Sequence, residues 1–172
     1  MKIHRSRGFT LIEMMIGLAI LGILFISALP SYSAWMQNMQ TRSTAESILN
    51  GAQLARAEAM RRNNNVQLTL AGTGWTVTVV RSGEQVQARP APDGSVNTTV
   101  TITPAAANSV TFNWLGRVTP NNDGTPSITQ VDVGSTVLAV PESRELRTTV
   151  GLGGSIRLCD TQASAGDPRS CL

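Results

Sequence analysis

Hydrophobic residues form one nearly unbroken run near the start of the chain. Residues 9–29 read FTLIEMMIGLAILGILFISAL, and Glu13 is the only charged residue in this run. As a helix, about 20 apolar residues match the ~30 Å hydrocarbon core of a bilayer. The run is longer than the apolar region of an ordinary signal peptide, and the helical pattern continues through Pro30-Ser31-Tyr32-Ser33-Ala34. The pattern therefore indicates a membrane-spanning helix that is retained, and not an ordinary signal peptide.

Beyond Pro30 the pattern becomes amphipathic. Apolar side chains recur at steps of three and four residues, which predicts a helical face that packs on a domain. This predicted face contains Tyr32, Trp35, Met36, Met39, Ile48, Ala52, Ala55 and Ala59. The opposite, polar face is predicted to contain Gln37, Asn38, Gln40, Thr41, Arg42 and Glu46. Arg61 and Arg62 suit a helix C-terminus, and Asn63–Asn65 ends the pattern. We predict one helix over residues 9–62, with a kink at Pro30.

From residue 66 onward, apolar and polar residues alternate as in β-strands. The runs 66–70 and 75–79 flank a glycine-containing loop at 71–74 and predict a hairpin. Further strands are predicted at 96–103, 110–114, 128–133, 136–140, 144–150 and 155–159. Turn-forming segments at 90–94, 120–124 and 151–154 separate them. The predicted fold class is α+β: a long kinked N-terminal helix, transmembrane in its first half, packed on antiparallel sheets of a C-terminal globular domain.

Positive charge is concentrated at one end of the chain. The 172 residues include 14 Lys and Arg against 11 Asp and Glu, which alone would favour an acidic partner such as nucleic acid. Lys2, Arg5 and Arg7 account for the whole excess, so residues 9–172 carry 11 cations against 11 carboxylates. Because these three cations precede the apolar run, the positive-inside rule predicts a cytoplasmic N-terminus and an external C-terminal domain.

Candidate chemistry for a metal or a catalytic site is scarce. Two cysteines and His4 cannot supply the four ligands of a closed zinc site. We find no nucleophile–base pair, and the glycine turns lack the strand-to-helix context of a phosphate-binding loop. We therefore expect no enzyme activity and no cofactor.

The residues around the start of the apolar run match a known processing signal. Arg7-Gly8-Phe9-Thr10-Leu11-Ile12-Glu13 resembles the class III leader of type IV pilins and type II secretion pseudopilins. The resemblance implies that a membrane prepilin peptidase cuts between Gly8 and Phe9 and methylates the new amino group, giving N-methylphenylalanine. It also implies a bacterial inner-membrane protein with a periplasmic globular domain, which later enters a pilus or pseudopilus.

The expected organisation follows from the leader and the two patterns. Residues 1–8 are a cleaved leader, and residues 9–30 are a transmembrane and assembly helix. Residues 31–62 are the amphipathic helix, and residues 63–172 form the β-rich domain with a C-terminal disulfide loop.

Glu13 is an unusual residue for a membrane helix. A carboxylate there is unfavourable by several kcal/mol unless it is paired, so its presence argues for a partner. The resemblance implies that this partner is the α-amino group of Phe9 on a neighbouring subunit during assembly. The alternative is a carboxylate at the helix start that is favoured by the helix dipole.

Two segments of the β-rich region extend the resemblance. FNWLGRVTP at residues 112–120 and GLGGSIRLC at residues 151–159 resemble the GspH/FimT family of minor pilins and pseudopilins. Taken singly, Gly116 and Gly153-Gly154 are also explained by turns that need positive φ. The family resemblance implies a minor subunit of a type IV pilus or type II secretion machine, at the tip or in the priming complex. Its partners would be other pilin subunits, the prepilin peptidase and the inner membrane.

The two cysteines lie close together at the C-terminus. Cys159 and Cys171 are placed on the external side by the predicted topology, where an oxidising envelope favours a disulfide over free thiols. The resulting loop resembles the C-terminal disulfide loop of many pilins.

DNA binding is the alternative function. Some FimT-type proteins bind DNA through arginines of the C-terminal tail, and Arg157 and Arg169 lie in the matching region. Arg144 and Arg147 are expected on an adjoining strand. The tail lacks the closely spaced Gly-Arg-x-Arg cluster of such binders. Asp160 and Asp167 also offset its charge, so a solvated face or ion pairs are the alternative explanation for these arginines.

Overall fold

A computed structural model describes residues 9–91, 97–140 and 142–171, and for residues 27–30 it describes the backbone only. Helix α1 spans Leu11–Arg62 and ends where the sequence predicted, at Asn63, which has a positive φ of 50°. The chain divides into two compact units, Met1–Trp35 and Met36–Leu172. The predicted kink at Pro30 falls where side chains are not described, and it stays a prediction.

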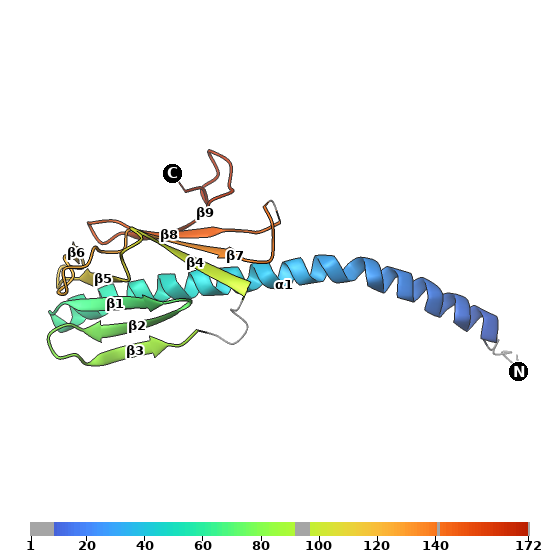
Figure 1. The fold of residues 1–172 in the computed structure, drawn as a ribbon, viewed down its shortest axis with the longest axis horizontal. Helices are drawn as coiled ribbons and strands as arrows, with labels where there is room; N and C mark the ends of the chain where they lie inside the picture. The colour runs from blue at the N-terminus through green and yellow to red at the C-terminus, as the bar shows by residue number, and fades with distance from the viewer. Residues whose placement is uncertain (1–8, 92–96, 141, 172) are drawn as a thin grey trace, which may run out of the picture. The chain divides into compact units, whose positions relative to one another are not determined.

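The second unit contains two antiparallel sheets and the C-terminal part of α1 (Figure 1). The first sheet has the order β3-β2-β1-β5-β6, and the second has the order β4-β7-β8-β9. The strands of the first sheet are β1 (Val66–Ala71), β2 (Gly74–Val79), β3 (Gln85–Arg89), β5 (Ser109–Phe112) and β6 (Val118–Thr119). The strands of the second sheet are β4 (Thr98–Thr103), β7 (Gln130–Ser135), β8 (Leu146–Val150) and β9 (Ile156–Asp160). This arrangement confirms the predicted α+β class.

Small residues on α1 allow the sheets to approach the helix closely. Ile48 and four alanines of α1 are buried in one core with residues from both sheets, such as Leu68 and Val133. The Trp75 ring of β2 lies against Gly51, where a Cβ would be 2.8 Å from the indole, and its Nε1–H donates to Ser47 Oγ at 2.9 Å. Burial of this apolar face stabilises the helix far more than its intrinsic propensity does.

The prediction of the helix faces was wrong in its first half. Thr41, predicted to be on the polar face, is buried, whereas Met36 and Met39, predicted to be on the packed face, are 38% and 48% exposed. Hydroxyl side chains occupy the buried positions 41, 44 and 47, and Ser47 Oγ accepts a hydrogen bond from Trp75 of β2. Apolarity alone could not separate a face that packs on its own domain from one that stays exposed.

Two strands were missed, and one was predicted wrongly. β3 has one half-buried residue, Val86, and pairs at the free edge of β2, so its sequence carries little apolar alternation. β6 has two residues. The predicted strand at 136–140 is a loop, because Ser135 Oγ accepts from the Val137 and Leu138 N–H groups and closes a turn that competes with strand pairing.

Candidate functional site

The N-terminus of α1 is capped by a reciprocal pair of hydrogen bonds between Thr10 and Glu13. The Glu13 N–H donates to Thr10 Oγ1 at 3.3 Å, and the Thr10 N–H donates to Glu13 Oε2 at 3.5 Å. This arrangement is a capping box, in which each side chain satisfies a backbone donor that the helix leaves free. Glu13 therefore has a local role in the single chain. Gly8 lies outside the described residues, and the Phe9 side chain is 80% exposed.

The first two turns of α1 continue into a fully apolar surface. The helix contains an 18-residue window of mean hydropathy 2.4, none of it buried, which is long and apolar enough to cross a membrane. The exposed apolar side chains include Leu11, Ile16, Leu18 and Leu21. Soluble monomeric proteins rarely expose an apolar surface of this extent, and larger exposed patches are typical of membrane or protein interaction sites.

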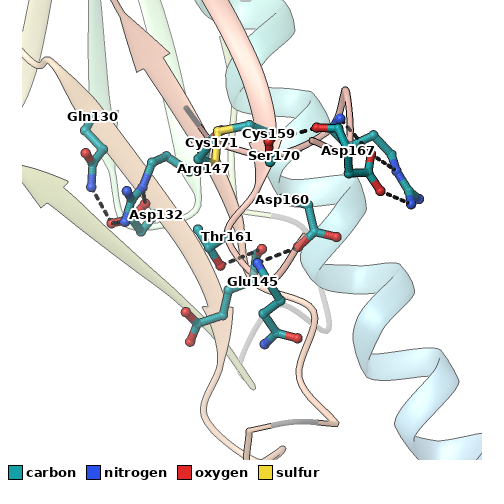
Figure 2. The surroundings of a disulfide bond; sticks show 12 residues. Gln130, Asp132, Glu145, Arg147, Cys159, Asp160, Thr161, Asp167, Ser170 and Cys171 are labelled. Atoms are coloured by element: carbon teal, nitrogen blue, oxygen red, sulfur yellow. Dashed lines mark hydrogen bonds and ion pairs between the residues drawn. A yellow bond between two sulfur atoms is a disulfide. The ribbon is translucent and has the colours of Figure 1, made fainter. Parts of the chain in front are cut away.

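The predicted disulfide is present at the C-terminus. Cys159 on β9 is bonded to Cys171, with Cα atoms 5.1 Å apart (Figure 2). The loop between them is held by the Asp160 N–H, which donates to the Arg169 carbonyl at 2.7 Å. The bridge therefore ties the chain end to the edge strand of the second sheet.

Most arginines near the disulfide are paired with carboxylates. Arg147 Nε donates to Asp132 Oδ1 at 2.6 Å across β7 and β8, where the two residues are register partners (Figure 2). Arg169 Nη2 lies 2.8 Å from Asp167 Oδ2, and this contact lowers the pKa of Asp167 to about 2. The Arg144 guanidinium is 3.9 Å from Asp160.

Arg157 differs from these three arginines. It is exposed, and the described part of the chain gives it no ion-pair partner. With Arg147, Gln130 and the disulfide, it lines a shallow depression of about 230 Å³. Arg169 lines a different depression, beside Arg42 and Leu158, so the two candidate DNA-binding residues do not share a site.

The fold also brings together residues that sequence analysis did not connect. Gly116 and Gly154 belong to separate turns that meet, and Arg56 of α1 donates through Nε to the Gly116 carbonyl at 3.1 Å. Both glycines lie in segments that resemble the GspH/FimT family, residues 112–120 and 151–159, but only the folded chain shows that they are in contact. Among the described residues there is no group of three His, Cys, Asp or Glu side chains placed to hold a metal ion.

The long helix with an exposed apolar start, the two antiparallel sheets and the C-terminal disulfide define a pilin-like subunit. A family model for the prokaryotic N-terminal methylation motif matches residues 3–29, and one for the type II transport protein GspH matches residues 44–170. The chain therefore belongs to the GspH family, whose members are structural pilin-type subunits and not known enzymes.

The fold is similar to that of a solved type IV minor pilin. The type IV minor pilin FimU of Pseudomonas aeruginosa matches with a TM-score of 0.53 and 19% identity, over 80% of this chain and 99% of that chain. A second crystal form of FimU matches with a TM-score of 0.49 and 21% identity, over 76% and 99% of the two chains. No curated protein matches the sequence at a significant level.

Proposed function

We propose that this chain is a minor pilin or pseudopilin that a prepilin peptidase cuts between Gly8 and Phe9 and methylates at Phe9. The subunit then leaves the inner membrane and joins a type IV pilus or a type II secretion pseudopilus, at its tip or in the priming complex. The observation that carries this proposal is the exposed apolar start of α1 with a single carboxylate, Glu13, at its first turn. Such a surface suits both a bilayer and the packed helices of a filament.

Tyr32 and Trp35 support the membrane stage of this proposal. They follow the apolar run by a few residues, their ring centroids are 5.9 Å apart, and both side chains are exposed. Tyrosine and tryptophan are enriched at membrane–water interfaces, where the ring is apolar and its polar group reaches water. The pair would mark the external boundary of the membrane-spanning segment.

Glu13 would have successive partners in this proposal. In the single chain the capping box holds its carboxylate at the helix start. In the filament, the methylated amino group of Phe9 on a neighbouring subunit would pair with it, since a charge among apolar helices needs an opposite charge. That pairing would set the register of the incoming subunit.

DNA binding is not proposed. Affinity for duplex DNA needs several phosphate contacts, and three of the four arginines considered are paired with Asp132, Asp160 and Asp167. One unpaired arginine, Arg157, is too little cationic surface for this function.

Mass spectrometry of the N-terminus tests the processing step. Coexpression with a prepilin peptidase should give a chain that begins at Phe9 and is heavier by one methyl group. A Gly8→Val variant should stay uncut, because a branched side chain at the scissile bond blocks cleavage. A chain that keeps residues 1–8 in the presence of active peptidase would contradict the proposal.

A further inference from the structure

Two tight turns of the second unit meet at a pair of glycines. The turn at 113–117 leads into β6, and the turn at 151–154 connects β8 to β9. A Cβ on Gly154 would lie 1.8 Å from the Gly116 carbonyl oxygen, so the two backbones are in direct contact. The Val118 N–H also donates to the Leu152 carbonyl at 3.1 Å, which fixes the second turn beside the first.

The first turn is rigid and displays two large apolar side chains. Asn113 Oδ1 accepts from the Leu115 and Arg117 N–H groups at 3.0 and 3.1 Å, and the Gly116 N–H donates to the Asn113 carbonyl at 2.8 Å. Trp114 and Leu115 at the tip of this turn are 55% and 51% exposed. Of the aromatic residues in 36–172, Trp75 and Phe112 are buried, and Trp114 is the exposed one.

The second turn adds a third apolar side chain. The Gly154 N–H donates to the Gly151 carbonyl at 2.8 Å, and Leu152 at the corner of this turn is 79% exposed. Rigid turns lose little conformational entropy on binding, and Trp and Arg are enriched among the residues that carry most of the binding energy of protein interfaces, to which exposed Leu side chains add apolar area. We refer to Trp114, Leu115, Leu152 and Arg117 as the two-turn surface.

The charge around these side chains limits what can bind. Arg117 is exposed and has no ion-pair partner in the described residues, and Arg56 contacts the same turn. The segments 113–117 and 151–155 contain no Asp or Glu. A twofold interface that used this surface on both copies would contain Arg117 and Arg56 twice and no carboxylate from these turns, which disfavours self-association through it.

We propose that the two-turn surface binds a different subunit of the same filament, through an apolar face edged by carboxylates. This inference rests on the proposed function, because it requires the chain to be a filament subunit. Trp114 and Leu152 would be the buried anchors, and Arg117 would select the partner by its charge.

Site-specific photocrosslinking of the full chain in its host tests the inference. Benzoylphenylalanine at position 115 should give an adduct with a second pilin-class chain, mapped to an apolar peptide that contains Asp or Glu. The variant with Trp114→Ser and Leu152→Ser should lower the adduct yield roughly tenfold or more, as for central anchors. Arg117→Glu, which reverses the charge of an exposed side chain that has no ion pair in the described residues, should lower it as well.

A matched control uses Val137→Ser with Val140→Ser, since these valines are similarly exposed but lie in residues 136–140, outside the two turns. This control should leave the adduct unchanged. No adduct, an adduct mainly with a second copy, or equal yields in all variants would overturn the inference.

Adducts should be scored in both membrane and sheared-filament fractions. Adduct formation in membranes without any chain in filaments would contradict the proposed function and support this surface. Incorporation into filaments without an adduct would support the proposed function and contradict the role of the two-turn surface.

Discussion

Gly154 lies so close to Gly116 that a Cβ on Gly154 would be 1.8 Å from the Gly116 carbonyl oxygen. Gly154 also has a φ of +84°, which side chains disfavour. We therefore expect Gly154→Ala to lower the free energy of unfolding by roughly 2–4 kcal/mol, through strain and displacement of the 113–117 turn. Urea unfolding of the detergent-solubilised chain measures this change.

Gly153 provides the control for that prediction. It has open space around its Cα, and its φ lies outside the left-handed region. Gly153→Ala should change the free energy of unfolding by less than about 0.5 kcal/mol. Equal effects of the two substitutions would show that the contact with Gly116 is unimportant.

The disulfide should stabilise the folded domain by restricting the unfolded chain. Cys159 and Cys171 are 12 residues apart, and a closed loop of this size corresponds to about 3 kcal/mol in the chain-entropy model. Replacing both cysteines by serine should lower the free energy of unfolding by that amount in urea titrations. An unchanged unfolding midpoint in the double variant would contradict the expectation.

Glu58 should make stability depend on acid pH. Hydrogen bonds from Arg61, at 2.6 Å, and from Arg62, at 2.7 Å, lower the pKa of Glu58 from 4.5 to about 2. A carboxyl with a lowered pKa contributes stability that is complete above pH 4.5 and is lost as the pH falls toward about 2. The slope of stability against pH in this window should be smaller in Glu58→Gln.

Glu46→Gln is the matched control for Glu58. Glu46 also pairs with an arginine on α1, at 2.8 Å from Arg42, but both side chains are largely exposed. Its replacement should change stability by no more than about 0.5 kcal/mol. If both variants altered the acid transition equally, the Glu58 cluster would not be responsible for it.

The arginines near the disulfide should not bind duplex DNA. Gel-shift titrations of the full chain at several salt concentrations should show no salt-dependent complex, because Arg144, Arg147 and Arg169 are paired. The variant with Arg157→Ala and Arg169→Ala should behave identically. A gel shift of DNA by the parent chain that weakens with salt and disappears in the variant would contradict this expectation and support DNA binding as a function.

Local sequence signals predicted the N-terminal methylation motif, the long helix and the first hairpin. The prepilin leader is a contiguous motif, and the β1–β2 hairpin is determined by residues next to each other in the chain, with Ala71 paired to Gly74. The fold class followed from counting one helical and several alternating segments. These predictions needed no long-range information.

Long-range contacts explain what the sequence could not predict. The pairing of Arg147 with Asp132 depends on the register of β7 and β8, which no local pattern specifies. The segment before β8 is held by Asn38 of α1, whose side chain donates to the Glu142 carbonyl at 2.9 Å and accepts from the Arg144 N–H at 2.8 Å. The pattern of apolar residues along the chain predicts neither of these contacts.

The capping box makes a sharp test of the role of Glu13 possible. Glutamine at the third helical position can make the same capping contact as glutamate, so Glu13→Gln removes the charge and keeps the cap. Thr10→Ala does the opposite, because it removes the cap and leaves the carboxylate. The two variants therefore separate a local structural role from an intermolecular ion pair.

Incorporation of these variants into sheared filaments is the most direct test of the account. Both variants should be cut and methylated at Phe9. We predict that Glu13→Gln stays in the membrane fraction and is lost from filaments, whereas Thr10→Ala enters filaments like the parent chain. Normal incorporation of Glu13→Gln, or equal loss of both variants, would contradict the proposal that the Glu13 charge directs assembly.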